Sequence, residues 1–290
     1  MKISEMFNNG RPVFSFEVFP PKRTSPIESI YEVLDELGQL KPDFISVTYG
    51  AAGNVANTDT IDICAGIKEK YGIESMAHLT CVHATKESVD IILDDLRKRN
   101  VNNILALRGD IVEGLEPQKD FLHASDLTSY IKSKGDFGVS GACYPEVHMD
   151  AESMREDIAN LKTKVEAGAE HLVSQLFFDN NCFYDFIEKV RIAGINVPVE
   201  AGIMPVTNKK QIERMVSMCG ASLPAKFSKV MQRFENNPEA LRDAGIAYAI
   251  NQIVDLVANG VDGIHIYTMN NPYIARKISE GVKNVIGHDI

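Results

Sequence analysis

Eight short apolar runs alternate with helical segments along this chain, and this order limits the folds that it can adopt. The runs cover residues 13–19, 44–49, 76–82, 103–107, 137–144, 171–178, 197–204 and 263–269. Most of them are almost continuously apolar, which is typical of strands that are buried on both faces of a parallel sheet. Strands that alternate with helices are typical of α/β folds, so we expect a parallel sheet covered by helices.

The segments between the runs carry helix start and stop signals. SPIE at residues 25–28 indicates a capping box with proline at the first helical position. NPE at residues 237–239 predicts the start of a long helix that ends near Asn259 and Gly260. After the fifth run, apolar residues recur at helical spacing at Met154, Ile158, Leu161 and Val165.

The length and the number of runs favour a closed barrel. A chain of 290 residues can form one (β/α)8 barrel, which typically requires about 250 residues. An open doubly wound sheet is the alternative, and its common sign is a GxGxxG loop after the first strand. Here the first run ends in FEVFPP at residues 16–21, and no change in composition indicates a linker. We therefore predict an α/β fold, a single (β/α)8 TIM barrel formed as one domain by residues 1–290.

Charge and composition exclude several classes of protein. A formal net charge of −10 without any long run of Lys or Arg argues against nucleic-acid binding, which needs clustered cations. Five cysteines without CxxC spacing argue against a disulfide framework and fit a reducing cytoplasm. The N-terminus lacks an apolar signal core, and no run approaches about 18 apolar residues. We therefore expect a soluble cytoplasmic protein that does not interact with a membrane.

Polar residues gather where the predicted strands end. In barrels of this type the chemistry lies at the C-terminal ends of the strands. Taken singly, these residues have structural readings, since Arg108 could form a salt bridge with Glu17 or with Asp110. Their convergence nevertheless indicates an active site, and we predict no metal because no grouping has metal-ligand spacing. The polar residues at these ends are Glu17, Thr48, Tyr49, His78, Thr80, Arg108, Asp110, Tyr144, Glu146, His148, Gln175, Glu200, Tyr267 and Thr268.

One helical segment carries a polar stripe beside its apolar one. Asp157, Asn160 and Lys164 stand at i, i+3 and i+7, so they lie on one helix face. The stripe is either a solvated face or a polar groove for a long cofactor. In the second reading Lys164 faces a phosphate and Asp157 a hydroxyl group.

Eight segments in order along the chain resemble the bacterial methylenetetrahydrofolate reductases. The likeness runs from about residue 13 to residue 270 and therefore covers nearly the whole chain. The segments are SFEVFPPK at 15–22, SVTYGA at 46–51, HLTC at 78–81, ALRGD at 106–110, YPEVH at 144–148, QLFFD at 175–179, GIMPV at 202–206 and YT at 267–268.

The resemblance implies a (β/α)8 barrel with non-covalent FAD and an activity in one-carbon metabolism. Members of this family reduce 5,10-methylenetetrahydrofolate to 5-methyltetrahydrofolate in two half-reactions, with NADH or NADPH reducing the flavin first. Glu17 resembles the family's general acid, and Asp110 resembles its carboxylate beside flavin and pterin. Gln175, Gln211 and Tyr267 resemble further folate contacts. The family contains oligomers, so a homo-oligomer is expected.

The resemblance also implies a set of FAD contacts. They are Thr48, Tyr49, His78, Arg108, Gly109, Asp110, His123, Ala124, Ala142, Tyr144, His148, Asp157, Asn160 and Lys164.

The chain departs from the better-known enterobacterial form at several positions. Asn271 stands where that form has an arginine for the glutamate tail of the folate, and Arg276 follows further along. Met215 stands where an aromatic residue stacks on the nicotinamide cofactor, and His123 replaces a tyrosine. Glu200 occupies a position that is usually apolar, and it either pairs with a neighbouring cation or is a second site carboxylate.

Two alternatives remain open from the sequence, and a third is disfavoured. A flavin-free pterin-binding barrel of one-carbon metabolism would bind folate, and the protein would be colourless. A barrel subunit of a larger redox complex would be silent by itself, and the departures at Met215 and Asn271 are compatible with that reading. A sugar-phosphate aldolase would need a lysine at a strand end, and none of the eight runs ends in lysine.

Overall fold

The computed structural model describes residues 1–21, 24–49, 58–111, 114 and 116–288, with no side-chain description for residues 58, 209, 211 and 214. Its strands form a closed parallel barrel in chain order, and β1 pairs with β8 to close it. This confirms the predicted TIM barrel. The strands are β1 (Val13–Val18), β2 (Phe44–Val47), β3 (Glu74–Thr80), β4 (Asn103–Leu107), β5 (Gly138–Cys143), β6 (His171–Ser174), β7 (Val199–Ile203) and β8 (Gly263–Tyr267).

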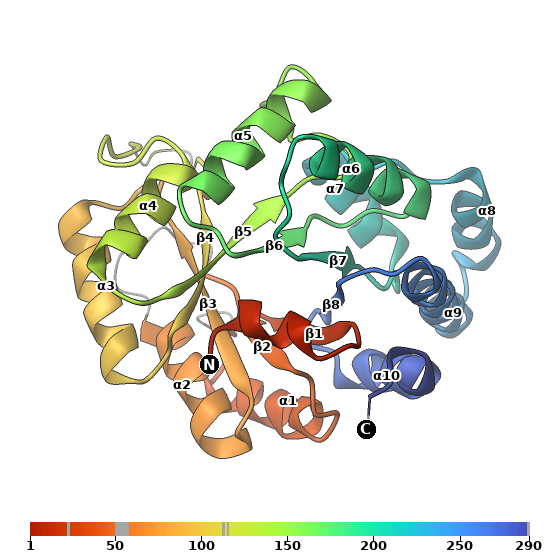
Figure 1. The fold of residues 1–290 in the computed structure, drawn as a ribbon. Helices are drawn as coiled ribbons and strands as arrows, with labels where there is room; N and C mark the ends of the chain where they lie inside the picture. Colours follow the sequence, from red (N-terminus) through yellow and green to blue (C-terminus); the bar gives the residue numbers. More distant parts are fainter. Residues whose placement is uncertain (22–23, 50–57, 112–113, 115, 289–290) are drawn as a thin grey trace.

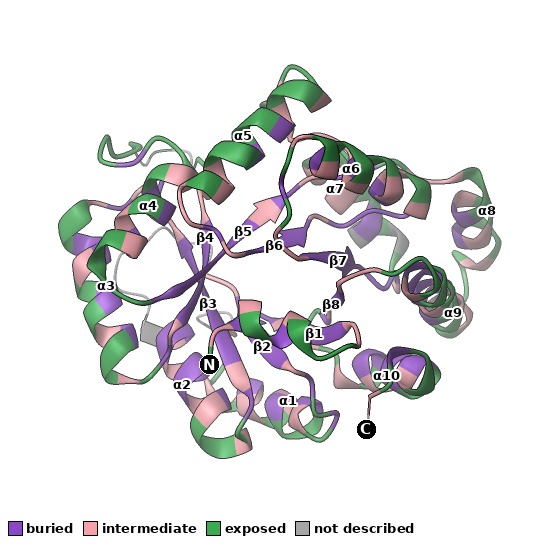
Figure 2. Ribbon diagram, viewed as in Figure 1, coloured by how far each residue is buried: buried purple, intermediate pink, exposed green. Residues whose placement is uncertain are grey.

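Helices surround the barrel as an outer layer (Figure 1). Figure 2 shows that the strands are mostly buried, whereas the helices are buried on their inner sides and exposed outside. The helices are α1 (Glu28–Gly38), α2 (Thr58–Tyr71), α3 (Lys86–Lys98), α4 (Ala124–Lys134), α5 (Met154–Glu166), α6 (Asn180–Ile192), α7 (Lys209–Cys219), α8 (Ala225–Phe234), α9 (Pro238–Ala258) and α10 (Pro272–Ile286).

A short 3-10 helix, η1 (Ile3–Asn8), closes the end of the barrel where the strands begin. Its Ile3 and Met6 pack with a small apolar cluster that includes Val13 and Phe44, the first residues of β1 and β2. The backbone N–H of Ile3 donates to the side chain of Asn103, the first residue of β4. The opposite end, where the strands finish, is therefore the end available for a site.

Side chains alternate along β1 between the two layers of the fold. Phe14, Phe16 and Val18 belong to the large core between strands and helices. Ser15 and Glu17 alternate with them and point to the barrel interior, where Ser15 contacts the side chains of other strands. This alternation brings Glu17 to the mouth of the barrel.

Two expectations about element ends are corrected by the structure. The capping box at residues 25–28 does not form: α1 begins at Glu28 after Ile27, which is already helical, and no side chain caps it. Ser25 therefore lies too far before the helix, and the Ser29 hydroxyl donates to the Pro26 carbonyl instead. Residues 175–178 are not part of β6, because the chain leaves the barrel there, and Leu176 and Phe178 pack in a second cluster around α7 and α8.

The predicted start of the long helix α9 is confirmed. The Asn237 side chain accepts a hydrogen bond from the Ala240 N–H at 3.1 Å, and Pro238 is the first helical residue. The helix ends at Ala258, and Gly260 follows with a φ of 76°, which is a usual way to end a helix.

Candidate active site

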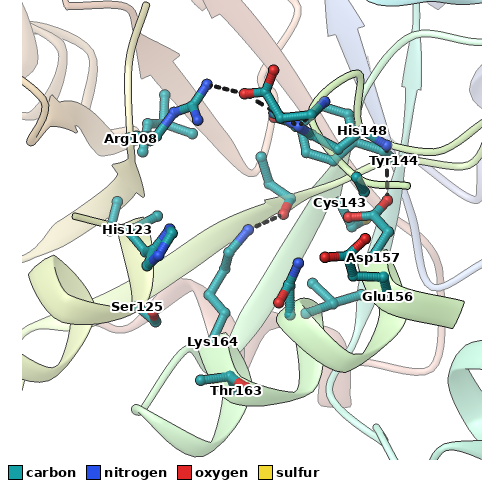
Figure 3. Close-up of a pocket in the computed structure, with 18 residues that line it drawn as sticks. Arg108, His123, Ser125, Cys143, Tyr144, His148, Glu156, Asp157, Thr163 and Lys164 are labelled. Carbon is teal, nitrogen blue, oxygen red and sulfur yellow. Dashed lines mark hydrogen bonds and ion pairs between the residues drawn. The ribbon is translucent and has the colours of Figure 1, made fainter. Parts of the chain in front are cut away.

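A pocket of about 430 Å³ lies beside the C-terminal ends of β4 and β5 and is bounded by α4 and α5. The polar stripe predicted on α5 faces this pocket, because Asp157, Asn160 and Lys164 all line it (Figure 3). The other predicted cofactor contacts that line it are Arg108, His123, Ala124, Ala142, Tyr144 and His148.

Lys164 reaches from α5 to β5 across the floor of the pocket. Its Nζ donates to the Ala142 carbonyl at 2.6 Å, and Figure 3 shows its side chain between His123 and Asp157. Burial lowers the pKa of Lys164 from its ordinary value, and the nearby Asp157 acts in the opposite direction. Gly141 makes room for the lysine stem, since a Cβ there would lie 2.6 Å from Lys164 Cδ.

Asp157 shapes the other side of the pocket. One of its oxygens accepts the backbone N–H of His148 at 2.9 Å, and burial raises the pKa of the carboxyl group. The chain turns just before His148 at Val147, whose φ is 74°. The ring of His148 lies edge-on to Tyr144 at 4.5 Å between centroids.

Arg108 forms an ion pair that the sequence did not reveal. Its guanidinium lies 2.5 Å from a carboxylate oxygen of Asp150, and this contact lowers the pKa of Asp150. The pairings with Glu17 or Asp110 that the sequence left open are therefore not the ones that form. Gly109 follows with a φ of 84°, and a Cβ there would lie 2.8 Å from Thr80 Cβ, so this turn needs glycine.

The N-terminus of α4 completes the pocket. His123, Ala124 and Ser125 line it, and the Asp126 carboxylate accepts the backbone N–H groups of Leu122 and His123, both at 2.9 Å. The first N–H groups of a helix have no partner within the helix, and its dipole favours anions there.

The chemistry of this pocket fits an anionic, hydroxyl-bearing organic cofactor such as a flavin dinucleotide. Arg108 and Lys164 supply cations, and the start of α4 supplies N–H groups for phosphate oxygens. Asp157 supplies acceptors for hydroxyl groups. Aligned donors for phosphate and acceptors for sugar are what a dinucleotide requires.

The mouth of the barrel holds Glu17 between two histidines. Its Oε2 lies 3.6 Å from His78 Nε2 and 3.8 Å from His265 Nε2. The Glu17 side chain is 20% exposed and His78 only 7%. Burial lowers the pKa of His78 to about 4, so this imidazole is neutral near pH 7.

The loop after β8 holds the backbone of Glu17 in place. The Thr268 hydroxyl donates to the Glu17 carbonyl at 2.6 Å. The Asn270 amide both accepts from and donates to the backbone of Phe19, at 3.0 and 2.8 Å. Met269 and Asn270 both have a φ of 53°, which turns the loop back onto β1.

The remaining predicted contacts lie on the same rim but not in the pocket. Thr48 and Tyr49 follow β2, and Gln175 follows β6, where its side-chain oxygen accepts the next backbone N–H at 2.9 Å. Asp110 is exposed on the loop after β4. The side chain of Gln211 lies outside the described residues.

Tyr267 is held across the top of the barrel. Its hydroxyl donates to the Ser174 carbonyl at 2.6 Å, and burial raises its pKa far above the usual value. Gly202 leaves room for the ring, since a Cβ there would lie 2.7 Å from the tyrosine oxygen.

Two of the departures from the enterobacterial pattern have structural roles. The Asn271 side chain caps α10 by accepting the Ile274 N–H at 3.3 Å, while Arg276 pairs with Glu36 of α1 at 3.2 Å. Met215 packs against the cluster around α7 and α8. A cavity of about 180 Å³ lies beside this loop, lined by Pro205, Thr207, Tyr267, Thr268, Met269, Asn271 and Ile274.

Glu200 is a buried residue of the barrel interior. It is fully buried and lies 3.0 Å from His171 Nε2, while the Ser15 hydroxyl donates to its other oxygen at 2.8 Å. Of the two roles that the sequence left open, the structure therefore favours a pairing role. Sequence reasoning missed His171 and Ser15, although their alternation with apolar neighbours in β6 and β1 is the pattern of inward-facing positions.

Two further features concern the part of the chain that the structure describes. No three His, Cys, Asp or Glu side chains there are placed to hold a metal ion. None of its helices combines the length and apolar character that a bilayer crossing requires.

A closed parallel barrel with a polar pocket and a carboxylate at the strand ends places the protein in the class of (β/α)8 barrels, whose functional sites lie at those ends. Within this class, the family model described as methylenetetrahydrofolate reductase matches residues 2–283. The chain therefore belongs to the methylenetetrahydrofolate reductase family, which confirms the resemblance.

Similar proteins come from bacteria and plants. The 5,10-methylenetetrahydrofolate reductase of Escherichia coli (strain K12) is 38% identical over 262 residues, which cover 90% of this chain and 87% of that protein. Methylenetetrahydrofolate reductase (NADH) 1 of Arabidopsis thaliana is 37% identical and matches 93% of this chain. The matched part is 48% of the plant protein, so the chain spans about half the length of that relative.

Solved structures of lower sequence identity share the fold. A Clostridium thermocellum protein that binds two copies of 5-methyl-5,6,7,8-tetrahydrofolic acid has a TM-score of 0.66 and 14% identity, over 98% of this chain and 100% of that one. Tryptophan synthase from M. tuberculosis has a TM-score of 0.57 and 11% identity, over 96% of both chains. Both likenesses concern the barrel alone.

Proposed function

We propose that the protein reduces 5,10-methylenetetrahydrofolate to 5-methyltetrahydrofolate, with NADH or NADPH as the electron donor and FAD as the bound cofactor. The membership of the family and the names of the bacterial relatives support the reaction. The name of the plant relative supports NADH as a donor. Two half-reactions would then alternate at one site.

The pocket beside β4 and β5 would hold FAD. Lys164, Arg108 and the start of α4 would bind the diphosphate, and Asp157 would bind hydroxyl groups. When bound, FAD supplies a group that accepts hydride from the nicotinamide and returns it to the folate. The protein's part is to orient the two partners at the barrel mouth and to manage the protons.

Glu17 would supply the proton that the folate requires. Opening the five-membered ring breaks a C–N bond, and the departing nitrogen must receive a proton. Glu17 is partly shielded at the mouth, and burial keeps the His78 imidazole beside it neutral near pH 7. A carboxyl group in this place is suited to donate the proton.

The other rim residues would position the substrate. Asp110 would face the cation that forms when the ring opens, because a carboxylate stabilises positive charge there. Gln175, Gln211 and Tyr267 would contact the folate. We further propose that the enzyme works in the cytoplasm as a homo-oligomer, which light scattering of the purified protein would test.

The observation that carries this proposal is the placement of Glu17 at the barrel mouth, at the same strand ends as a pocket lined by predicted cofactor residues. Glu17→Gln tests it. We expect flavin reduction by NADH to remain within about twofold, while reoxidation by methylenetetrahydrofolate falls by about 100-fold or more. Stopped-flow absorbance measures both steps separately. Equal losses in the two half-reactions would show that Glu17 is structural.

A further inference from the structure

Polar side chains form a continuous network inside the barrel, below Glu17. His265 Nδ1 lies 2.7 Å from the Ser15 hydroxyl, and that hydroxyl lies 2.8 Å from Glu200 Oε1. Glu200 Oε2 lies 3.0 Å from His171 Nε2. The network therefore links the barrel mouth to a carboxylate buried in the barrel interior.

The network is built into the strands. Ser15 and His265 are register partners of β1 and β8. Gly263 makes room for the carboxylate, since a Cβ there would lie 2.7 Å from Glu200 Cγ. Ser15, His171, Glu200 and His265 are all 0% exposed. Burying such groups is costly unless they are paired, and Ser15 contacts both Glu200 and His265 at hydrogen-bond distance.

Hydrogen counting ties the proton of His265 to the direction in which the Ser15 hydroxyl points. An ionised carboxylate only accepts hydrogen bonds, and a serine hydroxyl has one hydrogen to give. Because Ser15 gives that hydrogen to Glu200, its oxygen must accept from His265 Nδ1 at 2.7 Å. His265 then carries its proton on Nδ1. The bare Nε2 faces Ser46 at 3.4 Å and Glu17 at 3.8 Å.

We propose that Glu200 is a positioning residue which acts through Ser15 to set the tautomer of His265, so that an unprotonated nitrogen faces Glu17. A nitrogen lone pair beside Glu17 cannot donate a hydrogen bond to the carboxylate form, but it can accept one from the carboxylic acid form. This is the form that donates a proton to the departing nitrogen, with the O–H bond breaking as the N–H bond forms. The catalytic consequence rests on the proposed function, whereas the tautomer does not.

The other titratable groups beside Glu17 do not take over this role. His78 of β3 faces it at 3.6 Å, and burial lowers the pKa of that histidine to about 4. Tyr267 of β8 is its register partner, and burial raises the tyrosine pKa far above its usual value. Near pH 7 both are neutral, so His265 is the neighbour whose hydrogen position the network sets.

Glu200→Leu tests the network with little change in side-chain volume. Without the carboxylate, the Ser15 hydrogen turns to His265 Nδ1, and the ring proton moves to Nε2, opposite Glu17. Two-bond ¹H–¹⁵N correlation spectra of ¹⁵N-histidine protein report the tautomer, with His265 assigned from a His265→Asn variant. We expect Nδ1–H in the parent protein and Nε2–H in the variant.

The half-reactions give a second measurement. We expect the rate of flavin reduction by NADH to stay within about twofold. In the pH–rate profile of methylenetetrahydrofolate reduction, the fall in rate at high pH should begin at a lower pH, so that the rate at pH 7.5 decreases by about tenfold. Ser140→Ala is the matched control, because this buried hydroxyl contacts His171 at 2.9 Å on the far side of Glu200. It should leave both the tautomer and the pH profile unchanged.

Each result either supports the proposed network or contradicts it. An Nε2–H or doubly protonated His265 in the parent, or the same tautomer in both proteins, would overturn the proposal, as would equal losses in both half-reactions. A tautomer change in a protein that never reduces the folate would leave the network standing and reject the proposed function. If Glu200→Leu fails to fold, Glu200→Leu/His171→Leu removes both buried partners and leaves an apolar pair in their place.

Discussion

Lys164 is the residue on which cofactor binding should depend most. It brings a cation into the pocket from α5 and is oriented by the Ala142 carbonyl. Lys164→Met keeps the aliphatic stem and removes the charge, so we expect the affinity for FAD to fall by about tenfold or more. Quenching of flavin fluorescence on binding measures this change.

Lys162→Met is the matched control for this variant. Lys162 belongs to the same helix but is exposed and is not among the pocket residues. Its substitution should leave the affinity for FAD unchanged. An equal loss in both variants would mean that general surface charge, and not the pocket, binds the cofactor.

His78 should make the stability of the fold depend on pH. Burial lowers its pKa from 6.5 to about 4, so the unfolded chain binds more protons between these values. The contribution of His78 to the free energy of unfolding is then fully present above pH 6.5. It is lost as the pH falls toward 4 and amounts to about 3 kcal/mol. Urea unfolding at pH 4.5 and 7 measures the change, and His78→Gln should show a smaller decrease than the parent. Equal decreases would rule out this role.

At the residue scale, helical spacing predicted which side chains share a face. The pairs between residues far apart in sequence could not be predicted. Asp157, Asn160 and Lys164 share a helix face by periodicity alone, and all three line the pocket. The partner of Arg108 is Asp150, which lies on a different loop. The partners of Glu200 come from β1 and β6, so they depend on the register of a closed barrel, which a single sequence does not specify.

At the scale of elements, α9 packs unusually close to the chain that follows β7. A Cβ at Gly245 would lie 1.7 Å from the Val206 carbonyl oxygen. Gly245→Ala must therefore displace the helix or the loop, and we expect a loss of about 3 kcal/mol in the free energy of unfolding. Chemical denaturation followed by circular dichroism measures it.

Gly281→Ala in α10 is the matched control. There the added Cβ would lie 2.6 Å from Ile250 Cδ1, the far end of a flexible side chain, which can move away. Both substitutions gain helix propensity, by about 1 kcal/mol, so only the packing differs. Comparable stability of the two variants would contradict the close packing of α9.

The kind and order of the elements could be predicted because the apolar runs and helix signals are local. Element ends were less certain, since tertiary packing decides them. Leu176 and Phe178 pack in the cluster around α7 and α8, and Phe177 packs in the large core, so their apolar character does not indicate a continuation of β6. The proline at residue 26 indicated a helix start correctly to within two residues, but α1 begins only at Glu28.

At the scale of the whole molecule, the pairing of β1 with β8 joins the two ends of the chain in one sheet. This closure supports the proposal that residues 1–290 form one domain. It also gathers eight strand ends on one rim, so residues far apart in sequence, such as Glu17 and His265, become neighbours. The count of eight runs predicted this rim, and the site follows from it.

The absorbance spectrum of the purified protein, reconstituted with FAD and followed anaerobically, tests the central proposal most directly. We expect a flavin band that bleaches on addition of NADH or NADPH and returns when methylenetetrahydrofolate is added, with 5-methyltetrahydrofolate as the product. A band that bleaches but does not return with the folate would contradict the proposed reduction. No flavin band after reconstitution would reject the reductase and favour a flavin-free pterin-binding barrel.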